Sequence, residues 1–156
     1  MTLFVSSYTN KIDRKGRVSV PAPFRQMLAM KGSETVVLIP HPKYQSIEGS
    51  GMDLLEDYAA RLAQLPEYDA DRDALQATLF SQVSQLTPDA EGRIILPEIL
   101  LEAAGITENA IFVGAGTKFE IWDPTCYAAH FAQQQARVKE RNLTIPALLR
   151  ASAGAS

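Results

Sequence analysis

Cysteine and histidine are scarce in this chain of 156 residues. Cys126 is its one cysteine, so the chain forms no internal disulfide and its fold depends on packing. His41 and His130 are its two histidines, and together with Cys126 they do not show the ligand spacing of a zinc site. We therefore predict neither a structural metal nor a cofactor.

Long apolar runs are also missing. Aliphatic stretches such as residues 36–39 are far shorter than the roughly 20 residues that a membrane-spanning helix needs. The apolar residues 3–5 follow no basic region and give way at once to polar ones, unlike a secretory signal. Because 46% of the residues are hydrophobic, the chain can still bury a core. These features predict a cytoplasmic globular protein with no membrane partner.

Sequence signatures of catalysis are absent as well. The chain has no Gly-x-Ser-x-Gly elbow, no Walker phosphate loop and no His-Glu-x-x-His pair. Gly114 and Gly116 lack the third glycine of a dinucleotide fingerprint and lead toward a predicted strand, so we interpret them as a hairpin turn. The carboxylates of residues 69–73 have no histidine nearby in the sequence. We predict a protein that is not an enzyme and takes no small-molecule substrate.

The net charge of −3 hides a strong asymmetry. The segment 11–25 contains five basic residues and one acidic residue, whereas the segment 48–73 contains eight acidic residues and two arginines. A basic segment of this kind can contact nucleic acid. The acidic segment is either a solvated face or a surface that docks against the basic surface of a neighbouring subunit.

An internal repeat organises the chain. Residues 13–21 (DRKGRVSVP) match residues 89–97 (DAEGRIILP) at an offset of 76 residues. A short helical pattern and then a β-branched run follow in each copy, with a glycine between them, Gly32 or Gly105. Pro21 and Pro97 end a strand and suit the first turn of the helix that follows. Each copy is therefore predicted to be a loop, a strand, a helix and a strand.

The loop that opens each copy has a physical explanation. Gly16 and Gly92 stand where a tight turn needs positive φ, which glycine adopts without a Cβ penalty. Asp13 and Asp89 lie three residues earlier and can accept hydrogen bonds from the amides of the turn. We predict that these four residues shape the two loops.

Helical spacing of apolar residues fills the rest of the chain. It predicts a helical hairpin inserted at residues 51–81, between a first module at 1–50 and a second module at 82–123. Residues 124–156 are predicted to form a C-terminal helix that ends in a frayed tail from Ala151 onward.

Two Asp-x-x-Gly-Arg loops, each followed by an aliphatic strand and a proline, resemble the MraZ family of bacterial transcription regulators, which are built from paired AbrB-like modules. The segments that carry the resemblance come from both copies of the repeat: residues 8–25, 38–42, 89–97, 113–116 and 119–122. The resemblance implies an α+β fold in which two tandem modules of one chain form a swapped-hairpin β-barrel with surrounding helices.

The resemblance also implies a function. The protein is expected to form a closed ring of identical subunits and to bind direct repeats in double-stranded promoter DNA at the nucleoid. It is expected to repress its own division and cell-wall gene cluster. The alternative is an antitoxin-like AbrB relative that neutralises a partner protein.

Four basic residues are the candidates for DNA contact. Arg17 and Arg93 follow the two loop glycines, and a planar guanidinium can grip phosphate or guanine through two hydrogen bonds. Arg14 and Lys15 suit phosphate contacts without base preference. The second loop has Ala90 and Glu91 in place of these two, so it is less basic. Ion pairs of the two arginines with Asp13 and Asp89 are the alternative interpretation.

Two further residues have structural interpretations. We interpret His41, between two prolines, as a turn or packing residue. Cys126 stands near the start of the last predicted helix, where the helix dipole can lower the pKa of a thiol. Packing in the core is the interpretation that we favour for it.

Overall fold

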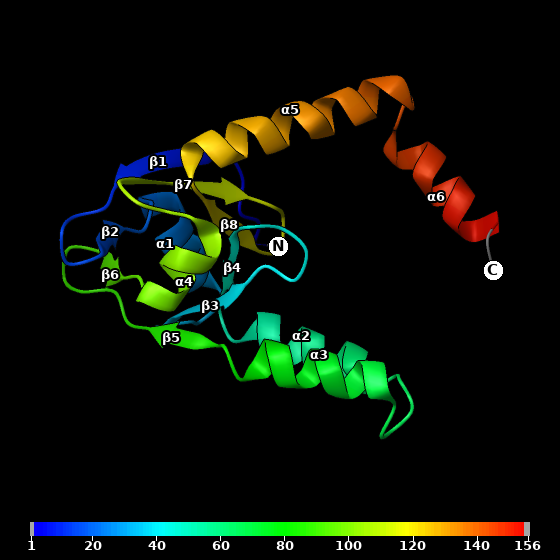
Figure 1. Cartoon of the computed structure of the whole chain (residues 1–156), viewed down its shortest axis with the longest axis horizontal. Coiled ribbons are helices and arrows are strands. Elements are labelled where there is room, and N and C mark those ends of the chain that lie inside the picture. The colour runs from blue at the N-terminus through cyan, green and yellow to red at the C-terminus, as the bar shows by residue number, and fades with distance from the viewer. Residues whose placement is uncertain (1, 155–156) are drawn as a thin grey trace. The chain divides into compact units, whose positions relative to one another are not determined.

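The computed structural model describes residues 2–154, and the chain divides into two compact units (Figure 1). The first unit ends at Pro124 and contains both copies of the repeat. The first copy forms β1 (Ser7–Lys11), β2 (Arg17–Ser19), α1 (Ala22–Met30), β3 (Val36–Pro40) and β4 (Ile47–Ser50). The second copy forms β5 (Ser84–Leu86), β6 (Arg93–Ile95), α4 (Glu98–Ala104), β7 (Asn109–Gly114) and β8 (Phe119–Trp122).

The two copies exchange strands. β1 pairs with β7 and β5 pairs with β3, so the first strand of each copy joins a strand of the other. β4 and β8 pair at the centre of this antiparallel six-stranded sheet, whose order is β1-β7-β8-β4-β3-β5. β2 and β6 pair in a separate two-stranded ribbon. The copies therefore complete each other's sheets and fold as one unit.

The combination of helices and antiparallel strands confirms the predicted α+β class, but the strands do not form the predicted closed barrel. Among residues 2–154, no hydrogen-bonded ladder joins β1 to β5, the two edges of the larger sheet. A tight turn precedes each ribbon strand, and Pro21 or Pro97 follows two residues after it, so each strand is three residues long. These two strands pair with each other and join neither edge of the larger sheet.

Aromatic rings fill the core of the first unit. The ring of Phe24, on α1, lies 5.4 Å from that of Phe4 and 5.3 Å from that of Phe119, measured between centroids. All three side chains are buried, and burial of each stabilises the fold by roughly 1.5–3 kcal/mol. The alternating residues that were predicted to share one strand face are buried too: Val18, Val20, Ile94 and Leu96.

The predicted turns and helix ends are present, with one small shift. Pro21 and Pro97 occupy the N-cap positions of α1 and α4, one residue before the first turn. Gly32 and Gly105 follow the two helices with φ of 74° and 64°. In the hairpin between β7 and β8, the backbone N–H of Ala115 donates to the carbonyl of Lys118 at 2.9 Å.

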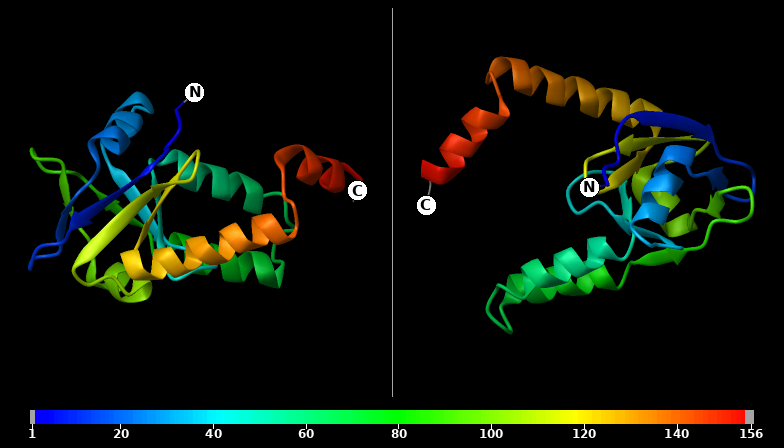
Figure 2. Two further views of the ribbon diagram at one scale, coloured as in Figure 1. Left: turned by 90° about the horizontal axis from the view of Figure 1, so that it is seen from above. Right: turned by 180° about the vertical axis from the view of Figure 1, so that it is seen from behind.

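The insert between the copies forms the two predicted helices, α2 (Asp53–Leu62) and α3 (Ala70–Phe80). They contact each other and lie side by side in the right-hand view of Figure 2. Helix α2 buries Leu54 and Leu62, while none of the described residues of α3 is buried. The carboxylate of Asp69 caps α3 by accepting hydrogen bonds from the backbone N–H groups of its first turn.

The second unit begins at Thr125 and contains most of α5 (Pro124–Glu140) and all of α6 (Ile145–Gly154). The prediction of a frayed tail is wrong over residues 151–154, because these residues continue α6. Two of them are alanines, and alanine has the highest helix propensity. Ala155 and Ser156 lie outside the described residues. Cys126 is half-buried on α5, so the prediction of a core cysteine is also wrong. None of the described helices is long and apolar enough to cross a membrane.

Candidate nucleic-acid interface

The ribbon of β2 and β6 brings the two predicted arginines onto one face. Val18 pairs with Ile94 in its centre, and both side chains face the core. Arg17 pairs with Ile95 and Ser19 with Arg93, one residue away on each strand, so these four side chains lie on the opposite, outward face. Arg17 and Arg93 also line one surface depression together with Asp89 and Ile95.

The first loop, Asp13–Gly16, is held rigid by its aspartate. One carboxylate oxygen of Asp13 accepts the backbone N–H groups of Lys15 and Arg17, both at 2.9 Å. Gly16 has a φ of 81°, and its N–H donates to the Asp13 carbonyl at 3.0 Å. In this geometry Asp13 binds the backbone of the turn and Gly16 supplies its positive φ.

The second loop, Asp89–Gly92, repeats this arrangement. Asp89 accepts the backbone N–H groups of Glu91 at 2.9 Å and Arg93 at 3.0 Å. Gly92 has a φ of 79°. The repeat in sequence therefore corresponds to a repeat in loop geometry, with one loop at each end of the antiparallel ribbon.

Each arginine also forms an ion pair with the aspartate of its own loop. Arg17 Nε lies 2.6 Å from Asp13 Oδ2, and Arg93 Nε lies 3.0 Å from Asp89 Oδ2. The ion pairs that the sequence offered as an alternative are thus present. They do not exhaust the guanidinium, because they use Nε and leave its two terminal amino groups to other contacts. About a third of each arginine side chain is exposed, at 33% and 31%.

These contacts stabilise the charged forms of the loop side chains, as the pKa shifts of both aspartates and of Arg93 show. The backbone N–H of Arg17, and next its guanidinium, lower the pKa of Asp13 below the usual 3.8. The backbone N–H of Arg93 is the largest cause of the lowered pKa of Asp89. The hydrogen bond to Asp89 in turn raises the pKa of Arg93. Both loops therefore keep their ion pairs at neutral pH.

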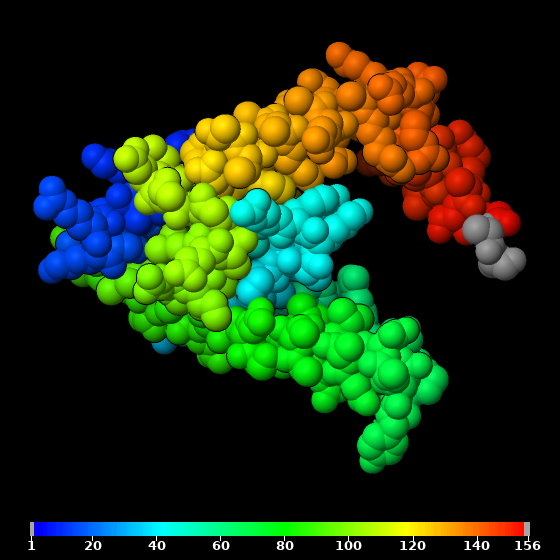
Figure 3. Space-filling model, viewed as in Figure 1, coloured from blue at the N-terminus to red at the C-terminus, as the bar shows by residue number. Residues whose placement is uncertain are grey.

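The two loops differ in electrostatics. Arg14 and Lys15 are exposed at the tip of the first loop, and this part of the chain, in blue, projects at the left edge of Figure 3. In the second loop the Glu91 carboxylate lies 3.5 Å from Arg93 Nε, so Arg93 has two acidic neighbours. The positive field is therefore concentrated on the first loop.

Arg25 is a neighbour of the second loop that the sequence did not reveal. Its guanidinium covers Gly92 so closely that a Cβ added there would lie 1.8 Å from Arg25 Nη1. Its Nε is buried without a hydrogen-bond partner among the described residues. The sequence showed Arg25 as part of the basic segment 11–25, but not that α1 of the first copy reaches the loop of the second.

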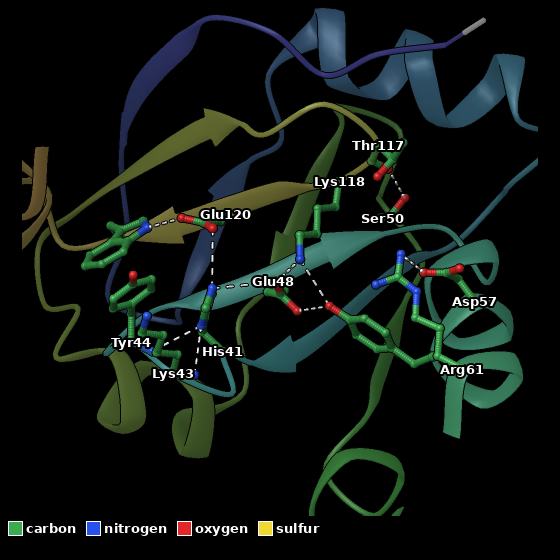
Figure 4. A network of polar contacts seen from close by, with 12 residues as sticks. His41, Lys43, Tyr44, Glu48, Ser50, Asp57, Arg61, Thr117, Lys118 and Glu120 are labelled. Carbon is green, nitrogen blue, oxygen red and sulfur yellow. Dashed lines mark hydrogen bonds and ion pairs between the residues drawn. The ribbon is translucent and has the colours of Figure 1, made fainter. Parts of the chain in front are cut away.

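A separate polar cluster lies in the central strands β4 and β8 (Figure 4). Glu48 is buried and accepts hydrogen bonds from the Tyr58 hydroxyl at 2.5 Å and from the Lys118 ammonium. His41 Nε2 lies 3.6 Å from Glu48 and 3.4 Å from Glu120. The sequence did not predict this cluster, because its members come from separate segments that meet only when β4 pairs with β8.

The geometry of the cluster bears on metal binding. One atom each of His41, Glu48 and Glu120 could ligate a cation. However, the Lys118 ammonium already holds Glu48, and a metal ion there would have to displace it. Burial opposes the charge on Lys118, yet its hydrogen bonds to Glu48 and Tyr58 outweigh burial and raise its pKa. We therefore assign the cluster a structural role and derive no metal chemistry from it.

His41 has the turn role that the sequence predicted. Its Nδ1 accepts the backbone N–H groups of Lys43 at 3.0 Å and Tyr44 at 3.1 Å, just after β3. This leaves Nε2 on the side of the two glutamates.

Comparison with known proteins identifies the family. The family model described as "MraZ protein, putative antitoxin-like" matches residues 79–145. A protein named transcriptional regulator MraZ from Parvibaculum lavamentivorans is 42% identical over 88% of this chain and 86% of its own length. Those from Azorhizobium caulinodans and Rickettsia canadensis are 38% and 37% identical, over 90% and 93% of this chain and 89% and 97% of their own. The paired Asp-x-x-Gly-Arg loops thus stand in a sequence that is similar to these regulators along nearly its whole length, and the chain belongs to the MraZ family.

Proposed function

We propose that this protein is a DNA-binding transcriptional regulator that reads promoter DNA with the ribbon of β2 and β6. The observation that carries the proposal is the placement of Arg17 and Arg93 on one outward face. Each follows a glycine turn that an aspartate holds by hydrogen bonds. The major groove of B-DNA admits a two-stranded β-ribbon, and an arginine there can hydrogen-bond guanine through two N–H groups. The names of the similar regulators from other bacteria support the same function.

The contacts divide between specificity and affinity. In this proposal Arg17 and Arg93 reach bases, while Arg14 and Lys15 neutralise phosphates next to the ribbon. The ion pair with Asp13 holds Arg17 in place before DNA arrives, so less side-chain entropy is lost on binding. The first loop provides most of the affinity, because Glu91 opposes phosphate approach at the second.

The distribution of charge supports an assembly of several subunits. A chain of net charge −3 with one strongly basic loop makes few phosphate contacts, so several subunits side by side are needed for useful affinity. We therefore propose a closed ring of identical subunits that binds direct repeats, resides at the nucleoid in the cytoplasm and represses its own division and cell-wall gene cluster. The exchange of strands between copies supports two swapped-hairpin modules, at 1–50 and 82–123.

The antitoxin-like alternative has one specific argument, the wording of the matching family model. An acidic surface at α2 and α3 would then neutralise a basic partner. Against this, antitoxins of the AbrB type usually carry one module and a disordered tail, whereas this chain has two copies of the repeat and residues 125–154 are largely helical.

A footprint separates the two functions. Purified protein is incubated with DNA from upstream of its own gene, and we expect protection of regularly spaced short repeats. A matched fragment with the repeats scrambled is the control. Equal binding to both fragments, together with copurification of a stoichiometric partner protein, would overturn the regulator in favour of the antitoxin.

A further inference from the structure

The C-terminal unit exposes an unusual amount of apolar surface. No residue of α5 or α6 that the structure describes is buried. Large apolar side chains stand in the solvent instead, with Ile145 exposed to 75% and Leu149 to 65%. The others are Phe131, Val138 and Leu148. Several large exposed apolar residues on the same two helices are typical of an interaction surface.

Basic residues accompany this apolar surface. Residues 125–154 contain four arginines and lysines and one acidic residue, Glu140. Three of the basic residues, Arg137, Lys139 and Arg141, stand around the exposed Val138 at the end of α5. We call this combination of α5 and α6 the basic apolar surface.

The hairpin of α2 and α3 has the opposite charge. Residues 51–81 contain seven acidic residues and two arginines. Apolar side chains are exposed there too: Tyr68 to 83%, with Leu65 and Leu75. We call this combination the acidic apolar surface.

We propose that the basic apolar surface of one subunit docks on the acidic apolar surface of a second copy of this chain. The proposal rests on the ring assembly of the proposed function and names the contact that builds it. Opposite charges fix the orientation of such a contact and disfavour like pairing, while the apolar side chains supply most of the buried area. Because the two surfaces differ, the contact is head-to-tail, and repeated head-to-tail contacts close into a ring when the rotation permits.

The composition of the basic apolar surface favours protein over DNA as its occupant. Interfaces with DNA are more polar than those with protein and depend on phosphate contacts. The exposed apolar side chains of Ile145, Leu148 and Leu149 cannot form hydrogen bonds or ion pairs with phosphates. Apolar residues flanked mainly by basic residues match the acidic apolar surface in both respects.

A charge exchange between subunits tests the contact. One variant combines Arg137→Glu, Lys139→Glu and Arg141→Glu, and the other combines Glu67→Lys, Asp71→Lys and Asp73→Lys, so that all six changes fall on exposed residues. Each alone places like charges in the contact, and the concentration at which half the subunits are assembled should rise at least about tenfold. Light scattering should then show the 17.1 kDa monomer where wild type is assembled. An equimolar mixture should recover assembly, because each variant supplies the surface that the other lacks.

Controls keep the outcomes apart. Arg14→Glu with Lys15→Glu is a charge reversal of the same kind away from both surfaces and should leave assembly intact. Leu148→Ser with Leu149→Ser should weaken assembly without changing charge, with circular dichroism to confirm the helices. Assembly of both charge variants at wild-type concentrations would overturn the proposed contact while leaving the ring itself standing.

Two further outcomes also overturn it. If the mixture fails but one chain carrying all six changes assembles, the acidic apolar surface is occupied within its own chain. If the variant with Arg137→Glu, Lys139→Glu and Arg141→Glu assembles normally but loses promoter binding, the basic apolar surface is a DNA contact. A wild-type protein that is monomeric at every concentration would instead refute the ring of the proposed function.

Discussion

The Arg25 guanidinium, on α1 of the first copy, lies directly on Gly92 in the loop of the second copy. This contact ties the helix of one copy to the loop of the other. Gly16, at the equivalent position of the first loop, has more room: an added Cβ would meet its nearest neighbour, the Leu96 carbonyl, at 3.4 Å. The two loop glycines share a positive φ but differ in what covers them.

Alanine substitutions should reveal this difference. Gly16→Ala and Gly92→Ala both place a Cβ at positive φ, which costs roughly 1–2 kcal/mol. Gly92→Ala should destabilise more, because Arg25 must also move. In a double-mutant cycle measured by urea unfolding, Arg25→Ala should remove the extra loss from Gly92→Ala and leave Gly16→Ala unaffected. Equal losses for both glycines would contradict a close Arg25 contact.

Acid should loosen both loops. The folded protein holds the pKa of Asp13 and Asp89 below the usual 3.8, so their stabilisation is complete above that value. It is lost as the pH falls through the lower, folded pKa. NMR titration should show the backbone N–H signals of Lys15 and Arg17 moving together with the Asp13 carboxyl. Asp13→Asn should remove the ion pair already at pH 7, and titration of Asp13 at or above 3.8 would refute the proposed hold of Asp13 on the loop.

Much of the loop and core could be predicted from sequence because each signal is local. An aspartate three residues before a glycine specifies the turn, and alternation of Val18 and Val20 specifies which side is buried. The Asp–Arg ion pairs were available as an alternative for the same reason, since the partners are four residues apart.

Features that depend on pairing between distant segments were beyond this reasoning. The contact of Arg25 with Gly92 and the cluster around Glu48 join residues of the two copies, whose strands pair as β2–β6 and β4–β8. The pairing that a β-barrel requires is also non-local: among residues 2–154, β2 and β6 pair only with each other and no ladder joins β1 to β5. The helix through residues 151–154 was missed because small residues are compatible with both a tail and a helix.

Lys118 should contribute to stability through Glu48. Lys118→Met leaves Glu48 buried beside Glu120 without its ammonium partner, and removing one member of a buried pair costs up to roughly 3–5 kcal/mol. The loss should be smaller here, since Lys118 is partly exposed, and Glu48→Gln should recover part of it. The pKa of Lys118 is raised in the folded protein, so wild type keeps this contribution up to the usual 10.5 and loses it above that. Urea unfolding from pH 8 to 11 should show a larger alkaline loss in wild type than in Lys118→Met, which keeps only the loss that follows from the raised pKa of Tyr58.

DNA binding should depend strongly on salt and on the number of repeats. Each phosphate that a loop neutralises steepens the fall of affinity with salt, by a slope of about 0.9 per contact on logarithmic axes. A probe with one repeat engages fewer loops, so its slope should be shallower and its affinity lower. Fluorescence anisotropy with one-repeat and multi-repeat probes across a salt series measures both. Equal affinities and equal slopes would argue against simultaneous binding by several subunits.

Arg17→Ala should abolish specific DNA binding, whereas Arg93→Ala should weaken it less. Both guanidinium groups stand on the outward face of the ribbon, but Arg17 has Arg14 and Lys15 nearby, and Arg93 has Glu91. Loss of a two-pronged contact to a base costs roughly 1–3 kcal/mol per subunit, and the loss recurs in every engaged subunit.

A third substitution, Arg17→Lys, separates the charge of the side chain from its shape, because lysine keeps the positive charge but lacks the planar guanidinium. It should retain nonspecific, salt-sensitive binding and lose preference for the repeat fragment over a scrambled one. Neither alanine change should unfold the protein, because each removes a partly exposed side chain whose ion pair contributes little to stability. Mobility-shift titrations of all three variants, with circular dichroism spectra beside them, make the measurement. A folded Arg17→Ala protein that binds the repeat fragment as wild type does would remove Arg17 from the interface and leave its ion pair with Asp13 as its whole role.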